Sequence, residues 1–180
     1  AEFGDIFLIS GGLVVDHADN RHYREHGSWP EEIQAKYRTK LIDVLTLFDG
    51  VQLPVGTRQR GTEYTTYIDC GIYEKYILPM TLELTAEKRF AGKLLGAVLT
   101  HGYINHLSGV NHGEYGTASL RKNLNQLLKV NPDFIVFFEW NEFNENTCFQ
   151  PTLRNSLALQ RLIKYYSLVI NGGEPAPEPG

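Results

Sequence analysis

Two acidic side chains, Glu142 and Glu145, stand three positions apart in the segment Glu-Trp-Asn-Glu-Phe-Asn-Glu-Asn-Thr at residues 139–147. Glycoside hydrolysis needs two carboxyl groups beside one bond, because one gives a proton while the other attacks or activates a nucleophile. Neighbouring like charges raise one pKa, which separates the acid from the base. The pair therefore predicts glycosidase chemistry, and a solvated acidic loop with a core tryptophan explains the residue types equally well.

The residues around the pair are types that bind sugars. Trp140 and Phe143 offer flat apolar faces on which sugar rings stack, and Asn141, Asn144 and Asn146 can hydrogen-bond hydroxyls without adding charge. We expect a substrate-binding role for Trp140, Asn141 and Phe143.

Two apolar runs precede polar segments and predict the strands that hold them. Phe134–Phe138 is continuously apolar, which is typical of a parallel strand covered on both faces, and it leads directly into the acidic segment. Leu94–Leu99 is a second such run, followed by a polar loop at residues 101–116. We expect His101 and Tyr103, near that strand's end, to face the same cleft. The loop's other histidines, His106 and His112, are expected in solvent.

Helices are predicted between these strands. Ser28-Trp-Pro-Glu31 reads as a capping box that begins a helix reaching Phe48, where Asp49-Gly50 ends it. Thr117 caps a second helix, with Leu120, Leu124, Leu127 and Leu128 on one face, and Leu153–Leu168 is a third. Ile6–Ile9 reads as a first strand, and the alternating segment Thr62–Leu84 as a strand or hairpin. Four tyrosines of that segment are expected to pack in the sheet: Tyr64, Tyr67, Tyr73 and Tyr76.

Strands that alternate with helices predict an α/β protein with a parallel sheet. The long polar loops follow the strands, which favours a (β/α) barrel of TIM-barrel type, with a doubly wound sheet as the alternative. A complete barrel takes about 250 residues, and only three or four strand–helix units can be placed here. We therefore expect residues 1–170 to be the C-terminal half of a barrel, completed by another copy, another chain or missing residues. The Pro- and Gly-rich residues 171–180 are expected to be a disordered linker.

A polar, histidine-rich loop is expected at residues 16–27. His22 and His26, four positions apart, could share a helical face and bind a metal, but no His-Glu-x-x-His pattern is present and two arginines would oppose a cation. A polar loop on the substrate side is the better interpretation, with Asp16 or His17 next to the cleft. We expect neither a metal nor a cofactor.

Composition sets further limits. A formal charge of −4 argues against nucleic-acid binding, and no run approaches the length of a membrane span. Cys70 and Cys148 could form one bridge or remain two buried thiols. The chain begins at Ala1 without a charged-then-apolar leader, so either a leader was removed or the chain is a piece of a longer polypeptide.

The pattern Trp-Asn-Glu-x-x-Glu-x-Thr, followed by a Pro and a helix, resembles the signature of glycoside hydrolase family 99, which includes endo-α-mannosidases. Upstream, Val98-Leu-Thr-His-Gly-Tyr103 and Asn131-Pro-Asp133 resemble the family's preceding unit. The resemblance covers residues 94–166 and implies a barrel glycosidase that retains configuration. Glu145 would be the general acid/base and Glu142 the base that assists the substrate's 2-hydroxyl.

For such an enzyme we expect an oligo- or polysaccharide substrate, for example an α-mannoside, and an extracellular, periplasmic or lumenal location. The alternative is a non-catalytic carbohydrate-binding or structural fragment of such a barrel. A metal-dependent hydrolase that uses the histidine-rich segment is a more distant third.

Overall fold

The computed structural model describes residues 6–11, 13, 15–54, 70–99, 101–105, 110–112, 117–137, 140–141, 148–153 and 156–174. The chain divides into two compact units, each described here by itself. The first unit comprises residues 1–57, 66–98 and 132–136, and the second comprises residues 58–65, 99–131 and 137–180.

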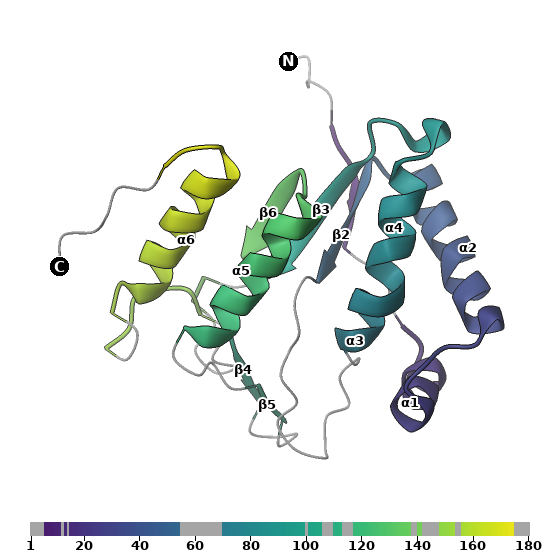
Figure 1. Cartoon of the computed structure of the whole chain (residues 1–180), viewed down its shortest axis with the longest axis horizontal. Helices are drawn as coiled ribbons and strands as arrows, with labels where there is room; N and C mark the ends of the chain where they lie inside the picture. Colours follow the sequence, from purple (N-terminus) through teal and green to yellow (C-terminus); the bar gives the residue numbers. More distant parts are fainter. Residues whose placement is uncertain are drawn as a thin grey trace. The chain divides into compact units, whose positions relative to one another are not determined.

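The first unit is built on a four-stranded parallel sheet (Figure 1). Its order is β1-β2-β3-β6, so the strands lie side by side in the same order as along the chain. A doubly wound sheet reverses its strand order at a switch point, whereas a barrel does not. The predicted α/β class is confirmed, and the sheet has the winding of part of a barrel. The strands are β1 (Ile9–Ser10), β2 (Gly50–Pro54), β3 (Leu94–Leu99) and β6 (Phe134–Phe137).

Strand β2 was not predicted, because Asp49-Gly50 reads as a helix end and Gln52 interrupts the short apolar run. Its first residue, Gly50, lies against β3 so closely that a Cβ there would stand 2.4 Å from the carbonyl oxygen of Leu94. Only glycine fits this approach, so the residue that reads as a helix stop also begins a strand.

The segment at residues 16–27, predicted as a loop, is largely a helix, α1 (His17–His26). The prediction was wrong because the segment is polar throughout and lacks the apolar spacing that identifies a helix. Asp16 precedes its first turn, and Gly27, at φ 68°, ends it in the left-handed conformation that glycine adopts without strain.

Helix α2 (Glu31–Leu47) confirms the predicted helix, which ends within one residue of the expected position but begins later. Pro30 is the N-cap residue and no side chain caps the helix, so the predicted capping box of Ser28 and Glu31 is wrong. The fixed φ angle of Pro30 restricts the backbone conformation at the start of the helix. The predicted apolar face is partly confirmed, since Tyr37 and Leu41 are fully buried.

The predicted strand at residues 62–84 is wrong where it can be compared, because residues 70–84 are helical. Residues 62–69, with Tyr64 and Tyr67, lie outside the described residues. Tyr73 and Tyr76 are buried, but in a helical segment and not in the sheet. The Tyr73 hydroxyl donates a hydrogen bond to the Leu13 carbonyl oxygen, and the Tyr76 hydroxyl accepts one from the Trp29 amide. The helical pieces are α3 (Cys70–Ile72), the π-helix η1 (Tyr73–Ile77), α4 (Leu78–Thr85) and the 3-10 turn η2 (Lys88–Phe90).

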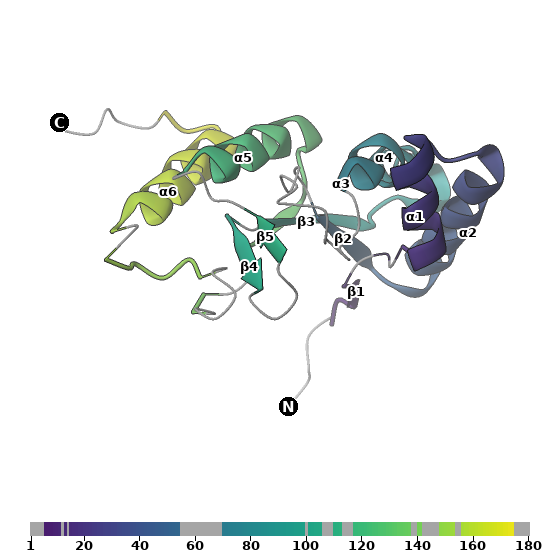
Figure 2. The ribbon, with the colours of Figure 1, turned by 90° about the horizontal axis from the view of Figure 1, so that it is seen from below.

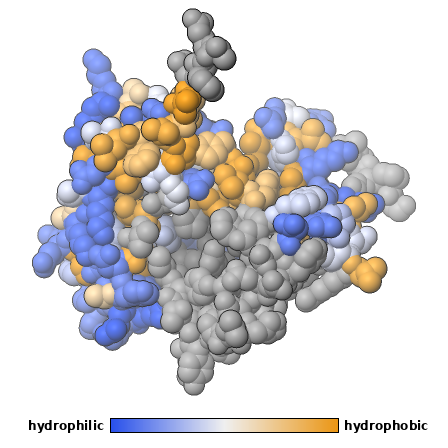
Figure 3. Space-filling view, turned by 180° about the vertical axis from the view of Figure 1, so that it is seen from behind, coloured by the Kyte–Doolittle hydropathy of each residue, from blue (hydrophilic) through white to orange (hydrophobic). Residues whose placement is uncertain are grey.

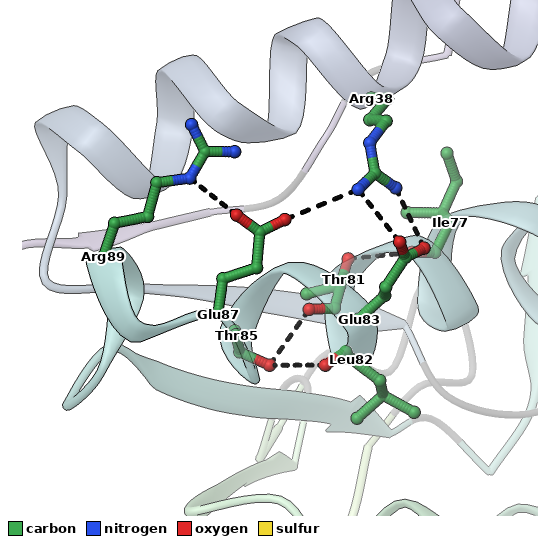
Figure 4. Close-up of polar contacts among 8 residues, drawn as sticks. All are labelled: Arg38, Ile77, Thr81, Leu82, Glu83, Thr85, Glu87 and Arg89. Atoms are coloured by element: carbon green, nitrogen blue, oxygen red, sulfur yellow. Dashed lines mark hydrogen bonds and ion pairs between the residues drawn. The ribbon is translucent and has the colours of Figure 1, made fainter.

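Helices α2 and α4 lie side by side in both ribbon views (Figures 1 and 2). Arg38 of α2 makes two hydrogen bonds to the Glu83 carboxylate of α4, at 2.9 and 3.0 Å, and also reaches Glu87 (Figure 4). Arg89 holds the other side of Glu87 at 2.7 Å. The pair of helices is therefore joined by an ion-pair network on its surface.

The second unit contains helices α5 (Ala118–Val130) and α6 (Ala158–Ile170). The helix after Thr117 is confirmed with its core positions Leu120, Leu124 and Leu127, whereas Leu128 is 40% exposed. Helix α6 begins five residues later than predicted, and its Tyr166 hydroxyl donates to Asn125 of α5 at 2.6 Å. The predicted loop at residues 101–116 contains an antiparallel hairpin of β4 (Tyr103–Asn105) and β5 (Val110–His112).

Strand β6 was predicted to be covered on both faces, but each of its residues is only half-buried. It is the last strand of the described sheet, so one edge has no described neighbour. No described helix is both long and apolar enough to cross a membrane. The boundary predicted at residue 170 stays a prediction, and residues 175–180 lie outside the described residues.

Candidate functional site

Trp140 of the acidic segment lies in the second unit, three residues beyond the end of β6. Trp140 is 58% exposed and Asn141 is exposed beside it, so both are accessible as a sugar-binding role requires. Residues 142–147, including Glu142, Phe143 and Glu145, lie outside the described residues. The carboxylate pair and the role of Phe143 therefore remain predictions.

The two ends of this segment are joined. The Gln150 amide donates a hydrogen bond of 2.8 Å to the Trp140 carbonyl oxygen. This backbone hydrogen bond joins two residues that are ten positions apart in the sequence.

Phe149 anchors the returning end of this loop. Its ring is 1% exposed and lies edge-on to His101 at 4.9 Å and to Phe137 at 5.3 Å between ring centroids. The Gln160 amide of α6 donates a hydrogen bond to the Phe149 carbonyl oxygen. Edge-to-face aromatic pairs are worth about 0.5–1.5 kcal/mol each beyond their burial. Phe149 is thus held by contacts with three parts of the chain: His101, Phe137 of β6 and Gln160 of α6.

His101 follows β3 and is 2% exposed, so its ring packs inside the second unit against Phe149. The predicted substrate-binding role of His101 stays a prediction, and the contact that the structure adds is with the loop anchor. For Tyr103, the backbone lies in β4 and the side chain is outside the described residues, as is that of His112 in β5. Cys148, next to Phe149, is buried. The choice between one bridge and two buried thiols stays a prediction, because the side chain of Cys70 lies outside the described residues.

Asp16 and His17 belong to the first unit, after β1. Lys36 binds the Asp16 carboxylate at 2.5 Å and the Asp19 carboxylate at 2.7 Å, and Lys40 lies 3.2 Å from Asp16. The hydrogen bonds from Lys36 and then Lys40 lower the pKa of Asp16 below its ordinary value. Asp16 is therefore an ion-paired residue at the start of α1, whereas His17 is exposed.

Beside these ion pairs lies a stack of three aromatic rings that the sequence did not indicate. Trp29 is 3% exposed and lies between Tyr37 and Tyr76, with ring centroids 4.6 and 5.0 Å away. Its indole N–H donates to the Asp19 carbonyl at 3.0 Å, and the Tyr37 hydroxyl donates to the Asp19 carboxylate at 2.7 Å. Burial is the main cause that raises the pKa of Tyr37. The stack joins α1, α2 and η1.

His22 and His26 do share a face of α1, with ring centroids 4.4 Å apart. Within the described ranges, no three His, Cys, Asp or Glu side chains come together as metal ligands. The nearby carboxylates of Asp16 and Asp19 are already occupied by Lys36.

Topology relates the candidate residues. Asp16 follows β1, His101 follows β3 and Trp140 follows β6, so each comes after the carboxyl end of a strand. The active sites of (β/α) barrels are built from the segments at that end. Contacts bring together His101, Phe149 and the ends of the acidic loop within the second unit. Asp16 and His17 form a separate cluster within the first.

No family model matches the chain, and none of the curated proteins does. Among solved structures, the chain is similar to the GH99 endo-α-mannosidase of Bacteroides thetaiotaomicron, with a TM-score of 0.51 and 16% identity over 77% of this chain and 43% of that one. The same enzyme in complex with BIS-TRIS-propane gives a TM-score of 0.50 and 15% identity over 74% and 44% of the two chains. The chain thus spans less than half the length of these structures. Its fold is that of part of a TIM barrel, similar to part of this glycosidase.

Proposed function

We propose that the chain is part of a glycoside hydrolase in which Glu142 and Glu145 carry the reaction. The observation that carries the proposal is the placement of the acidic segment after β6, in a parallel sheet similar to part of a GH99 endo-α-mannosidase. Segments in this position supply the catalytic groups of barrel enzymes.

In the proposed reaction Glu145 donates its proton to the oxygen of the leaving sugar as the glycosidic bond breaks. Glu142 accepts the proton of the substrate's own 2-hydroxyl, whose oxygen attacks the anomeric carbon. Water then attacks the anomeric carbon of this intermediate, Glu145 takes a proton from that water, and Glu142 returns its proton to the 2-oxygen, so that both residues are restored and the product keeps its configuration. The resemblance to glycoside hydrolase family 99 assigns these two roles, and it makes an α-mannoside the proposed substrate.

The loop anchor supports this proposal. Catalytic groups act efficiently only when their positions are held, because misplacement by about 1 Å can cost a hundredfold in rate. The hydrogen bond between Trp140 and Gln150 and the packing of Phe149 restrain both ends of the segment that contains the pair. The exposed ring of Trp140 is available for a sugar to stack upon.

A second candidate function is a non-catalytic carbohydrate-binding fragment of such a barrel. The observation in its favour is that the chain matches only 43% of the length of the GH99 enzyme. Such a fragment would keep the sugar-stacking surface of Trp140 without a complete set of catalytic groups.

The release of reducing ends from α-mannan by the wild-type chain, E142Q and E145Q separates these candidates. General acid–base groups contribute about 10²- to 10⁴-fold, so each variant should lose that much activity under the first proposal. Glu32→Gln, at an exposed position of α2, is the matched control and should retain full activity. Near-normal turnover in either E142Q or E145Q would end the catalytic assignment. Binding of mannan by the wild type without any release would establish the second candidate instead.

A further inference from the structure

The last turn of helix α1 carries two histidine rings side by side. The ring centroids of His22 and His26 are 4.4 Å apart, and the ring planes are tilted by 48°. His22 is half-buried, and the side chain of His26 is 58% exposed. The side of the first unit that carries α1 and α2 is mostly hydrophilic in the view from behind (Figure 3). The pair therefore lies on a polar face of the first unit.

Two histidines at this spacing have the geometry of a metal chelate. Residues four positions apart lie on one face of a helix, and histidines so placed can bind one zinc ion. Imidazole nitrogens bind zinc at about 2.0–2.1 Å, so two rings on one ion bring their nitrogens to about 3 Å from each other. Rings with centroids 4.4 Å apart reach this distance by rotation of the two side chains, without movement of the helix.

The charges around α1 favour a cation on this face. An α-helix turns about 100° per residue, so His22 and His26 lie about 40° apart around its axis. Arg24 lies about 160° from each of them, and Arg21 lies about 100° from His22. The Glu25 carboxylate, in contrast, is 4.0 Å from a ring nitrogen of His26. From the sequence both arginines were expected to oppose a cation, but the helix places neither on the face of the pair.

The pair also lies at the end of the helix that attracts positive charge. His26 is the last residue of α1, and Gly27 follows it. The carbonyl groups of a helix C-terminus carry partial negative charge, which favours cations within the last turn. The Lys75 ammonium group donates a hydrogen bond of 3.1 Å to the Gly27 carbonyl oxygen, so this end of α1 does bind a cation.

The helix that spaces the two rings is fixed to the rest of the first unit. The Trp29 indole N–H donates to the Asp19 carbonyl oxygen at 3.0 Å, and Lys36 binds the Asp19 carboxylate at 2.7 Å. The backbone of the site is therefore in place before an ion binds, and binding has to order only two side chains. Such preorganisation lowers the entropic cost of binding.

We propose that His22 and His26 together bind one divalent transition-metal ion. Imidazole ligands favour Zn²⁺, Cu²⁺ and Ni²⁺ over Mg²⁺ and Ca²⁺. Among the described residues no third His, Cys, Asp or Glu joins the pair as a ligand, so water fills the remaining positions of the ion. The ion links residues one turn apart, and it therefore stabilises the last turn of α1. This role is separate from the proposed hydrolysis.

Calorimetric titration of the whole chain with Ni²⁺, in a buffer without chelating groups, tests the site. We expect Ni²⁺ to bind and Mg²⁺ not to bind. Even the loss of a group that only orients a metal ligand lowers affinity about 10- to 100-fold, so His22→Ala and His26→Ala should each weaken Ni²⁺ binding at least about tenfold. A wild-type chain that does not bind Ni²⁺, or a variant of either histidine that binds it as tightly as the wild type, would overturn the proposal.

His17→Ala is the matched control, because His17 is an exposed histidine of the same helix that lies about 140° from His22 around the axis. This variant should bind Ni²⁺ as the wild type does, with an unchanged circular dichroism spectrum in all three variants. An equal loss in His17→Ala would show that the ion is held by histidines in general and not by this pair.

Unfolding gives a second readout that needs no enzyme activity. An ion that binds only the folded chain stabilises it. In a Trp140→Phe background, Ni²⁺ should raise the urea concentration at which Trp29 fluorescence reports unfolding, and His22→Ala should abolish this shift. A shift of the same size in His22→Ala would refute the stabilisation of α1 by the pair. E142Q and E145Q should bind Ni²⁺ as the wild type does, whatever their effect on mannan hydrolysis.

Discussion

Two polar segments follow strands of the same sheet, yet they are built in opposite ways. The segment after β1 is the helix α1, and the carboxylates of Asp16 and Asp19 at its start are bound by Lys36. In the segment after β6, the Gln150 amide bonds the Trp140 carbonyl oxygen, and the Phe149 ring packs against His101. In the first, the carboxylates are paired with lysine side chains. In the second, the described contacts are all at the root, and Trp140 remains open to solvent.

This difference separates a scaffold from a candidate site. Ion pairs that lower the pKa of Asp16 keep that carboxylate charged and bound, which suits a structural role. Trp140, by contrast, is exposed, as its proposed role in binding a sugar requires. The chain has two tryptophans, Trp29 in the first unit and Trp140 in the second, so tryptophan fluorescence can follow the two units separately.

The largest expected effect comes from Phe149→Ala. Removing a buried aromatic ring costs about 3–5 kcal/mol, and the loss should fall on the second unit. We expect Trp140 fluorescence, in a Trp29→Phe background, to report unfolding at lower urea, and mannan hydrolysis to fall with it. The milder Phe149→Leu variant should remain folded and show reduced kcat with little change in KM, because the loop root is loosened.

The comparison would fail if Phe149→Ala left the second unit as stable as the wild type. It would also fail if Phe149→Leu retained full kcat, since the anchor would then have no part in positioning the loop. The matched change in the first unit is Tyr76→Leu, which should lower the stability reported by Trp29 and leave the KM for mannan unchanged.

A smaller effect is expected from Asp16→Asn, and it depends on pH. The folded pKa of Asp16 lies below the ordinary 3.8, so its ion pairs stabilise the fold above pH 3.8, and this stabilisation is lost as the pH falls further. The variant should be less stable than the wild type at pH 7 and equal to it once Asp16 is protonated. Urea titrations followed by Trp29 fluorescence, in a Trp140→Phe background, measure this difference. A gap between the two proteins that persisted at low pH would show that charge is not the cause.

The smallest effect is expected from Glu83→Gln. Arg38 lowers the pKa of Glu83 through two hydrogen bonds, but the pair lies on the surface (Figure 4). Solvent screens such pairs, so the variant should differ little from the wild type in urea unfolding, and less still at high salt. A loss comparable to that of Asp16→Asn would mean that the α2–α4 surface network matters more to the first unit than the pairs around Lys36.

The parts of the fold that the sequence predicted are those with uninterrupted apolar patterns. Leu94–Leu99 and the strand from Phe134 are continuous runs, and the leucines of α5 repeat at helical spacing. Strand β2 was missed because Asp49-Gly50 reads as a helix end and Gln52 interrupts its short apolar run. Helix α1 was missed because its stability comes from Lys36 and Trp29, which are distant in sequence.

The residues of the candidate site also divide into those that the sequence could predict and those that it could not. The acidic pair could be proposed from residue types and spacing alone, because a carboxylate pair after a strand needs no partner to be recognised. The anchor at Phe149 could not, because it depends on His101 and Phe137, which contact it only in the folded chain. Asp16 and His17 were placed by the sequence on the substrate side, whereas the structure shows Asp16 bound by two lysines.

The most direct measurement of the central claim compares E145Q on two α-mannosides, one with a sugar leaving group and one with a good aryl leaving group. Departure of a sugar needs a proton, whereas departure of a stable aryl oxide does not. We therefore expect E145Q to lose orders of magnitude on the sugar substrate but to retain the first step on the aryl substrate, seen as a burst of released aryl oxide. E142Q should lose both. Equal losses by E145Q on the two substrates, or full activity of E142Q on either, would contradict the assignment of the acidic pair.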